Sequence, residues 1–359
     1  EVGDYAYPAF FDYDADGDQD MFIGNYGNES FIGVIAQYEN IGTPTSASFR
    51  LITPDYLNLS QLVQFSIKPQ FIDINSDGNM DLAFGLADPT RLISNLLYIP
   101  GNSPNTLDFA NQQILNSNFW VFYTENMLLE DIDQDGKVDL LVGRSNGALE
   151  YWRNTAASGS FQFVLENPAF MGLGESISRN NLTAAVADLD NDGRSDLMTG
   201  DQGGRITIFG DFRNTINFPQ PVTDIVFDSF SQTYSGRNLG GRIKPVATNL
   251  FNSDKPSIAV GTVSGGMLIL KNDGGQLLSD EPEIVIYPNP IPRNDNFNVK
   301  SDRNVLMQVF TIMGQKLTEP VFITANQPLT VSTTGLLPGI YIVRFTYAGL
   351  TYGQKFVIY

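Results

Sequence analysis

One segment occurs four times and decides the fold: FFDYDADGDQDMFIG (10–24), FIDINSDGNMDLAFG (71–85), LEDIDQDGKVDLLVG (129–143) and VADLDNDGRSDLMTG (186–200). A fifth, less regular copy reads VATNLFNSDKPSIAVG (246–261). The copies begin their central loops at Asp12, Asp73, Asp131, Asp188 and Asn249, which are 57 to 61 residues apart. A fixed period of this length indicates a repeat architecture.

Each copy is typical of a strand, an acidic turn and a second strand. A looser similarity follows in QYENIGTPTSASF (37–49), YWRNTAASGSFQF (151–163) and YIPGNSPNTLDF (98–109), and it predicts the closing strand and exit turn of each unit. Units built from such short strands must stack on their neighbours, as propeller blades or as a solenoid. Radial closure protects the strand edges better, and independent 60-residue domains would have thin cores. We therefore predict an all-β fold, with a β-propeller over residues 1–275.

Composition narrows the chemistry that is available to the chain. The 359 residues contain 21 Lys plus Arg and 40 Asp plus Glu, a formal net charge of −19, which disfavours nucleic acid as a partner. Cysteine and histidine are both absent, which excludes disulfides, thiolate nucleophiles, Ser-His-Asp triads and most transition-metal sites. No run of about 18 apolar residues occurs, so we expect no transmembrane helix. The chain begins at Glu1 rather than Met, and we interpret it as processed or as a fragment.

The acidic loops have the spacing of a calcium site. Oxygen side chains occupy loop positions 1, 3, 5 and 9, and alternate residues of a short loop can surround a hard cation that takes six to eight oxygens. At position 7 stand Asp18, Asn79, Lys137 and Arg194, so we expect the backbone carbonyl of that residue to be the ligand. The predicted side-chain ligands are Asp12, Asp14, Asp16 and Asp20; Asp73, Asn75, Asp77 and Asp81; Asp131, Asp133, Asp135 and Asp139; and Asp188, Asp190, Asp192 and Asp196.

Other features of the loops refine this prediction. Position 6 is always glycine, at residues 17, 78, 136 and 193, where we expect a sharp turn that a Cβ would obstruct. A plain Asp/Gly turn would explain one such loop, but four copies with identical offsets favour a metal, and Ca²⁺ fits better than Mg²⁺. The loop with Asn75 has only three carboxylates, so we expect it to bind most weakly. Phe251, Ser253 and Ser257 replace acids in the fifth copy, for which we predict no metal.

These loops resemble the FG-GAP/VCBS repeats of integrin-α-like β-propellers. The resemblance covers residues 1 to about 275, and it implies one calcium loop per blade, or about four bound Ca²⁺ ions. Such propellers usually have seven blades, whereas five units are visible here. The family is mostly adhesive or scaffolding, and some bacterial relatives are lyases.

The last 75 or so residues form a separate pattern after a polar linker, which we place at 276–283. Alternating apolar and polar residues predict a small β-sandwich over 284–359. The expected strands span residues 284–287, 296–300, 305–312, 329–332, 340–346 and 354–359.

Four motifs of this tail, YPNP (287–290), VFTIMGQKL (309–317), LLPGIYIVRF (336–345) and KFVIY (355–359), resemble in order and spacing the type A C-terminal sorting domain of the type IX secretion system of Bacteroidota. An ordinary Ig-like or carbohydrate-binding sandwich is the alternative. The resemblance implies export to the cell surface, with a shuttle β-barrel, translocon and sortase as partners and cleavage in the linker. The motif residues are Tyr287, Pro288, Asn289, Pro290, Gly314, Gly339, Tyr341 and Lys355.

Three functions remain open for the repeats. A non-enzymatic adhesion or binding module, with an unknown surface protein or glycan as its ligand, is favoured because only the metal ligands recur. Trp120, Trp152 and Tyr151 could form a sugar platform, although aromatic residues in a blade more often belong to the core. A calcium-assisted polysaccharide lyase with a Tyr or Lys base is the rival, although the sequence alone does not place a pair such as Lys68 and Glu130 in one cleft. The third is a scaffold for an absent N-terminal domain.

Overall fold

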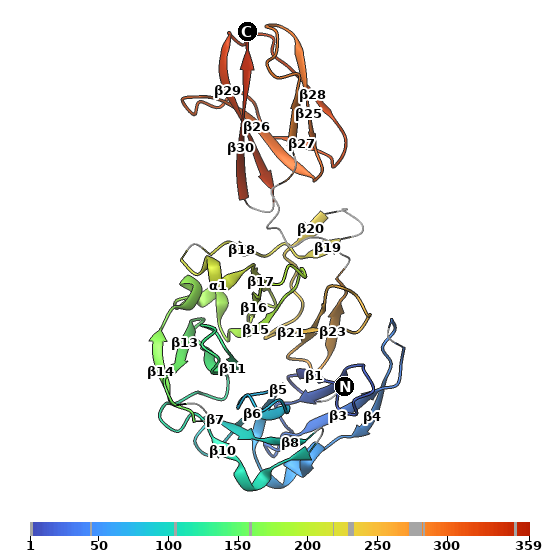
Figure 1. The fold of residues 1–359 in the computed structure, drawn as a ribbon, viewed down its shortest axis with the longest axis vertical. Coiled ribbons are helices and arrows are strands. Elements are labelled where there is room, and N and C mark those ends of the chain that lie inside the picture. Colours follow the sequence, from blue (N-terminus) through green and yellow to red (C-terminus); the bar gives the residue numbers. More distant parts are fainter. Residues whose placement is uncertain are drawn as a thin grey trace. The chain divides into compact units, whose positions relative to one another are not determined.

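The computed structural model describes residues 3–43, 45–103, 106–157, 160–217, 219–228, 233–272, 282, 284–347 and 350–359. The fold is all-β and its sheets are antiparallel, which confirms the all-β part of the predicted fold class. The chain divides into two compact units, residues 1–275 and 276–359 (Figure 1). Of the predicted linker 276–283, only Pro282 belongs to the described residues.

The first unit contains five main sheets in which strands pair in chain order. The first two sheets comprise β1 (Tyr7–Phe11), β2 (Asp20–Gly24), β3 (Ile35–Asn40) and β4 (Phe49–Thr53), then β5 (Phe65–Ile72), β6 (Asp81–Ala87), β7 (Ser94–Ile99) and β10 (Gln113–Ile114). The third and fourth comprise β11 (Asn126–Glu130), β12 (Asp139–Gly143), β13 (Leu149–Asn154) and β14 (Phe163–Asn167), then β15 (Thr183–Ala187), β16 (Asp196–Gly200), β17 (Ile206–Phe209) and β18 (Pro221–Val222). The fifth comprises β21 (Lys244–Thr248), β22 (Ser257–Gly261) and β23 (Met267–Leu270).

Short elements connect or flank these sheets. Two small ribbons pair β8 (Gly101–Ser103) with β9 (Thr106–Leu107) and β19 (Val226–Asp228) with β20 (Thr233–Ser235). The helical elements are the 3-10 turns η1 (Tyr56–Leu62), η2 (Phe109–Asn111), η3 (Phe170–Gly172) and η4 (Ile177–Arg179), and the single-turn α1 (Phe212–Thr215). Across the described ranges, no helix is both long enough and apolar enough to cross a membrane.

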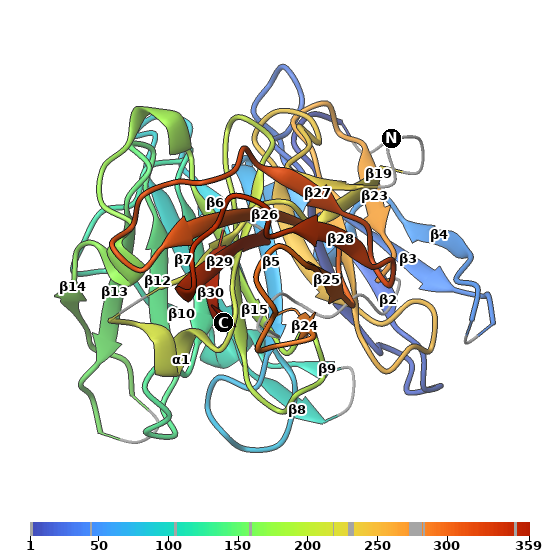
Figure 2. The same ribbon diagram turned by 90° about the horizontal axis from the view of Figure 1, so that it is seen from above.

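The first strands of the five sheets contact one another in succession. Strand β1 lies against β5, β5 against β11, β11 against β15, and β15 against β21. Strand β21 in turn contacts β1. At that contact the backbone N–H groups of Tyr5 and Ala6 donate to the carbonyls of Val263 and Thr262, at 2.9 and 3.0 Å. In Figure 2, β5 and β15 lie in the middle of the first unit, whereas β4 and β14 lie at its outer sides.

The glycine that ends the second strand of the first, third and fifth sheets makes close contact with the next sheet possible. A Cβ on Gly24 would lie 2.1 Å from the carbonyl oxygen of Ile67 in the next sheet, and a Cβ on Gly143 would lie 2.1 Å from that of Leu182. In the fifth sheet, a Cβ on Gly261 would lie 2.1 Å from the carbonyl oxygen of Ala6, in the first sheet. In these three sheets the final glycine of the repeat is therefore a packing residue, and the fifth sheet uses it against the first; Gly85 differs, because its Cβ would meet only side chains, at 3.4 Å or more.

Substitution of Gly143 by alanine is expected to lower the free energy of unfolding by about 1–3 kcal/mol, because the new Cβ would force two backbones apart. Chemical denaturation monitored by circular dichroism measures the effect. Gly174→Ala is the matched control, because its Cβ would meet only the Ala169 side chain, at 3.7 Å. Equal stability of the two variants would contradict the packing role.

Apolar residues are buried between neighbouring sheets. One cluster joins the first two sheets through residues such as Phe22 and Phe84. Further clusters join the second to the third sheet and the third to the fourth, the latter around Leu141 and Phe170. Because each sheet shares its apolar faces with neighbours, no single repeat has a complete core of its own.

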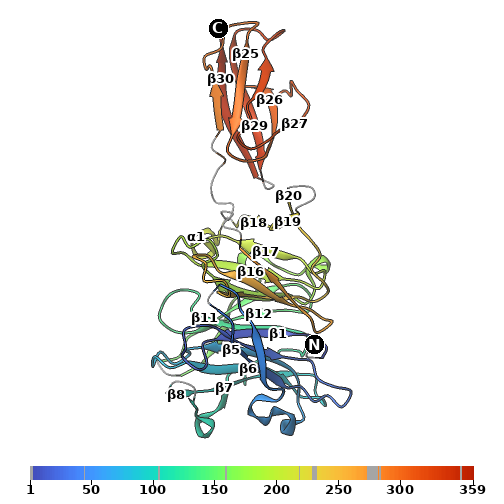
Figure 3. The same ribbon diagram turned by 90° about the vertical axis from the view of Figure 1, so that its right-hand side faces the viewer.

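The second unit contains two sheets that pack on one common core. The three-stranded sheet comprises β24 (Ile284–Tyr287), β25 (Asn296–Ser301) and β28 (Leu329–Ser332). The four-stranded sheet comprises β26 (Val305–Thr311), β27 (Val321–Ile323), β29 (Gly339–Tyr347) and β30 (Leu350–Ile358), and Figure 3 shows strands of both. Phe297, Phe345 and Phe356 are fully buried between them. The six predicted strands are confirmed to within four residues at their ends, whereas β27 was not predicted.

The motifs of this tail contact one another. The Asn289 side chain of YPNP donates to the Lys355 carbonyl at 3.2 Å and accepts from the Val357 N–H at 3.1 Å, so the first motif is tied to the last. The two X-Pro bonds of YPNP, at Pro288 and Pro290, are cis. Gly314 has a φ of +84° in the turn after β26. The Tyr341 hydroxyl donates to the Leu337 carbonyl at 2.7 Å, which holds the turn before β29.

Candidate metal centres

The four acidic loops are the turns of the innermost hairpins. Each loop begins directly after the first strand of a sheet, and the last ladder pair joins the residue before position 1 to the aspartate at position 9. These pairs are Phe11–Asp20, Ile72–Asp81, Glu130–Asp139 and Ala187–Asp196. The shared register places all the predicted ligands of one loop in one closed turn.

The four turns have the same backbone conformation. Loop position 4 has a positive φ in every copy, at Ala15, Ser76, Gln134 and Asn191. The glycines at position 6 have φ between +82° and +98°. A Cβ on these glycines would have no atom within 4 Å, so the expectation that it would be obstructed is wrong. Glycine is favoured there because side-chain-bearing residues rarely adopt that φ.

Backbone N–H groups hold one oxygen of the aspartates at positions 1 and 5. Gly136 N–H donates to Asp131 Oδ2 at 3.0 Å, and Lys137 N–H donates to Asp135 Oδ1 at 3.0 Å. The other three loops repeat both bonds. The second oxygens of two position-1 aspartates, Asp12 Oδ1 and Asp131 Oδ1, are buried without a hydrogen-bond partner. Such an oxygen needs a partner from outside the protein chain, which a cation or an ordered water would supply.

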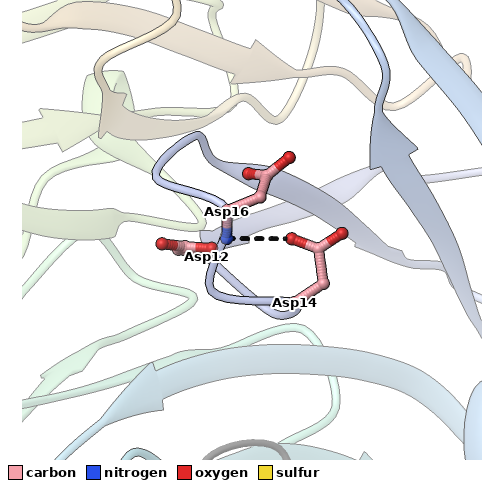
Figure 4. Close-up of side chains that lie close together, drawn as sticks. All are labelled: Asp12, Asp14 and Asp16. Carbon is pink, nitrogen blue, oxygen red and sulfur yellow. Dashed lines mark hydrogen bonds between the residues drawn. The ribbon is translucent and has the colours of Figure 1, made fainter.

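Three of the four loops bring three carboxylates together. Their oxygen atoms lie within 4.8 Å of one another in the groups Asp12, Asp14 and Asp16; Asp131, Asp133 and Asp139; and Asp188, Asp190 and Asp196. Figure 4 shows the first group, in which the Asp16 N–H donates to Asp14 Oδ1 at 3.3 Å. Among the described residues, the second loop holds no such group. There the Asn75 side-chain amide donates to Asp77 Oδ2 at 3.0 Å, so an N–H group contacts a carboxylate oxygen that was predicted to be a metal ligand.

The position-9 aspartates have a structural role that the spacing did not reveal. Each is buried, and both of its oxygens accept backbone N–H groups: Asp20 accepts from Tyr13 at 3.0 Å and from Asn40 at 2.8 Å. Equivalent bonds occur at Asp81, Asp139 and Asp196. Burial is the main cause that raises the pKa of all four carboxyl groups, and it raises that of Asp196 to about 6. This aspartate anchors the loop to the third strand.

The second repeated motif supplies that third-strand partner. Asn40 in QYEN and Asn154 in YWRN donate their N–H to the position-9 aspartate, and their side-chain oxygens accept from the exit turn. Gly101 has the same role in the second sheet, at 2.7 Å from Asp81. The repeated asparagine was a usable sequence signal for this contact.

Basic side chains contact the third and fourth loops. Lys137 Nζ lies 3.1 Å from Asp135 Oδ2, Arg153 Nε lies 2.7 Å from Asp133 Oδ2, and Arg194 pairs with Asp192 and with Asp211. Within the described ranges, no Lys or Arg pairs with the first loop. There, burial and the neighbouring carboxylates raise the pKa of Asp18. A cation entering the third or fourth loop must therefore compete with side chains that are already present.

The fifth loop is held by amide and hydroxyl groups. The Asn249 side chain donates to the Ser253 carbonyl at 3.2 Å and accepts from the Ser253 N–H at 3.1 Å. Gln19, from the first loop, accepts from Thr248 and from the Asn249 N–H. Bonds within the turn and to Gln19 therefore hold it, and the absence of a metal there stays a prediction.

The other candidates from the sequence are dispersed. Tyr151 is buried and donates to Asp139 Oδ2, whereas Trp152, on the opposite face of β13, stacks on Phe119 with a centroid distance of 4.1 Å. The two residues therefore do not share one platform, and Trp120 is 72% exposed. Lys68 donates to the Tyr123 and Glu125 carbonyls. Glu130 pairs with Arg213 at 2.8 Å, so the structure gives Lys68 and Glu130 different partners.

Repeated acidic hairpins and a separate two-sheet tail place the chain in the class of β-repeat proteins. Comparison with protein families finds a match in each part: residues 131–199 match the FG-GAP-like repeat, and residues 285–359 match the secretion system C-terminal sorting domain. Both resemblances are thereby confirmed. The tail is a type IX sorting domain, so the protein is exported by a Bacteroidota-type bacterium to its surface or beyond.

Comparison with known proteins adds little more. The solved structures that are similar include an exo-beta-1,3-galactanase from Phanerochaete chrysosporium, crystallised with beta-1,3-galactotriose. It is 10% identical, with a TM-score of 0.37, and the match covers 98% of this chain and 95% of that chain. A search of curated proteins finds no match.

Proposed function

We propose that residues 1–275 form a five-bladed β-propeller in which four hairpin loops bind Ca²⁺. The proposal of five blades rather than seven rests on the succession of first strands, in which β21 contacts β1. The Gly261 contact with Ala6 repeats the contacts of Gly24 and Gly143, so the fifth sheet meets the first as the first meets the second and the third meets the fourth. We also propose that the tail is an Ig-like sandwich, because its two sheets pack around one shared core.

The orphaned oxygens of Asp12 and Asp131 carry the metal proposal. In each loop the side chains at positions 1, 3, 5 and 9 and the carbonyl of position 7 would hold the ion, and hard oxygen ligands of this number favour Ca²⁺ over Mg²⁺. When bound, the ion supplies positive charge to a turn that otherwise gathers carboxylates. Its role here is to hold the hairpin turn, and we assign it no catalytic step.

We propose that the propeller is a non-enzymatic adhesion or binding module on the cell surface, with a glycan or a surface protein as its ligand. Surface export by the sorting domain supports this function. The tail would be recognised by the shuttle β-barrel, translocon and sortase. The rival functions are a calcium-assisted polysaccharide lyase and a scaffold for a further N-terminal domain. Turnover of acidic and neutral polysaccharides, with and without calcium, distinguishes a lyase from an adhesin.

Calorimetric titration of the full chain with CaCl₂ is expected to show binding of about four ions in the range of extracellular calcium modules. The double variant Asp12→Asn/Asp14→Asn is expected to lose one ion, because both residues belong to the first carboxylate group. Asp302→Asn is the matched control, since it makes the same charge change per residue in the tail. Absence of heat at millimolar calcium would contradict the proposal.

A further inference from the structure

The two outward faces of the tail differ in chemistry. In the three-stranded sheet, the side chains of β25 and β28 that face away from the core are polar, namely those of Asn296, Asn298, Lys300, Thr330 and Ser332. The Thr330 hydroxyl donates to Asn298 Oδ1 at 2.8 Å. This is the usual arrangement of an antiparallel sheet that has one face on the core and the other in solvent.

The outward face of the four-stranded sheet carries a large apolar patch instead. On β26, β29 and β30, the side chains that alternate with buried core residues include Leu306, Phe310, Ile340, Ile342 and Val357. Phe310 lies opposite Ile342, and Ile340 lies opposite Val357, so four of these residues are neighbours across three strands. Leu306 and Ile340 are exposed. A contiguous exposed apolar patch marks a contact with a protein or a membrane.

The apolar patch continues into the turns at one end of the tail. The ladder between β26 and β29 ends at the pair Thr311–Tyr341, so the turn after β26 and the segment before β29 lie together beyond that pair. Ile284, the first residue of β24, pairs with Ser301 and therefore lies at the opposite end. Large apolar side chains protrude from the two turns: Ile312, Met313 and Leu337 are 60%, 90% and 64% exposed.

Basic side chains lie directly behind this apolar end. Lys316 is opposite Phe310 and Lys355 is opposite Ile342, so two lysines flank one apolar pair. The Arg344 guanidinium lies 4.5 Å from the centroid of the Phe310 ring. Lys316 pairs with the exposed Glu319. Within the ranges that the structure describes, no carboxylate forms an ion pair with Arg344 or Lys355.

The charge of the tail is opposite to that of the rest of the chain. Residues 284–359 contain six Lys and Arg and three Asp and Glu, a net charge of +3. Residues 1–283 contain 15 and 37, a net charge of −22. An apolar face that holds Arg344 and Lys355 is complementary to an anionic surface, whereas a second copy of the same face would bring like charges together.

The order of residues along the strands favours a membrane over a protein as the partner. On β29, Ile340, Ile342 and Arg344 follow one another on the outward face at intervals of roughly 7 Å. The basic groups beside Ile342 and at Arg344 are therefore roughly 7–14 Å behind Ile340. Apolar groups docked on a bilayer enter it by about 5–10 Å, while basic groups stay at the level of the headgroups. A protein interface would instead have polar groups all around an apolar centre.

We propose that this end of the tail docks on an anionic lipid surface. The apolar turns around Met313 and Leu337 enter between the headgroups, and Lys316, Arg344 and Lys355 contact lipid phosphates. The sorting domain directs the protein to the cell surface, where such a contact is available. The inference concerns the tail alone and shares no residue with the calcium loops, so its failure would leave the proposed calcium sites unaffected.

Flotation of the full chain with lipid vesicles tests the proposal. Vesicles of equal parts phosphatidylglycerol and phosphatidylcholine are expected to bind the chain at least about tenfold more tightly than vesicles of phosphatidylcholine alone. Raising the NaCl concentration from about 0.1 to about 0.5 M is expected to release the unaltered chain, because salt screens the attraction between exposed charges. Equal binding to the two kinds of vesicle would overturn the proposal.

Two variants test the residues. The double variant Arg344→Gln/Lys355→Gln is expected to weaken binding to the anionic vesicles at least about tenfold, and Met313→Ser about fivefold. Lys300→Gln and Val285→Ser are the matched controls, because they make similar changes at exposed positions of the three-stranded sheet, and they are expected to change binding less than about twofold.

The substituted side chains are exposed, so all variants are expected to melt as the unaltered chain does, which circular dichroism checks. Anionic vesicles that bind the double variant as tightly as the unaltered chain would refute the assignment of the basic residues. If the unaltered chain binds no vesicles, the lipid proposal is wrong and the apolar face is left for a protein partner.

Discussion

Removal of calcium by EDTA is expected to lower the melting temperature of the first unit, with the largest effect of any change in solution conditions. A loop occupied at about a hundred times its dissociation constant adds about 2.7 kcal/mol to the free energy of unfolding. One kcal/mol shifts the melting temperature of a domain of about 150–250 residues by roughly 2–4 °C. Each filled loop is therefore expected to contribute roughly 5–10 °C. Calorimetry of the full chain with calcium, then with chelator, measures the shift.

Two variants of the first loop distinguish the stability that the metal contributes from the stability that the hydrogen bonds of the turn contribute. Asp14 is exposed, and an asparagine there keeps the oxygen that accepts the Asp16 N–H, so Asp14→Asn is expected to be destabilising only in calcium. Asp20 is buried and accepts from Tyr13 and Asn40, so Asp20→Asn is expected to cost about 1–3 kcal/mol with or without calcium. A melting temperature indifferent to EDTA, or two variants that behave alike in EDTA, would refute this division of roles.

The sequence predicts best what one short segment encodes. The acidic loops, the strands beside them and the six tail strands follow from local spacing and alternation, because turn chemistry and side-chain period act over a few residues. Weaker calcium binding by the Asn75 loop stays a prediction; it rests on the single acceptor oxygen of an amide, and the structure adds the hydrogen bond from Asn75 to Asp77.

Features that depend on contacts between distant segments were not predicted. Tyr5, Tyr123 and Arg242 meet at one pocket although more than a hundred residues separate each from the next, and no spacing rule connects them. The contact of Arg153 with the third loop requires its strand, β13, to lie beside that loop. The contact of Arg194, in the fourth loop, requires Asp211, in the turn after β17, to lie beside it. Strand β27 is only three residues long, which is too short for alternation to reveal.

Deletion of residues 284–359 is expected to abolish delivery of the protein to the cell surface. The core of the tail consists of residues between Ile284 and Ile358, so its removal takes no side chain from the cores of the first unit. The truncated chain should therefore fold and accumulate in the periplasm, because the sorting domain that directs type IX export is missing. Surface labelling of intact cells, compared with fractionation of the periplasm, measures the change.

A full-length chain with Asp14→Asn is the control, because it weakens one calcium loop and leaves the sorting domain intact. Asn289→Ala is a finer test, since the Asn289 side chain ties YPNP to the final strand through Lys355 and Val357. We expect it to reduce surface delivery without lowering the stability of the first unit, because the export machinery would meet a tail whose motifs are no longer held together. Normal surface delivery of the truncated chain would show that the first unit carries an export signal of its own.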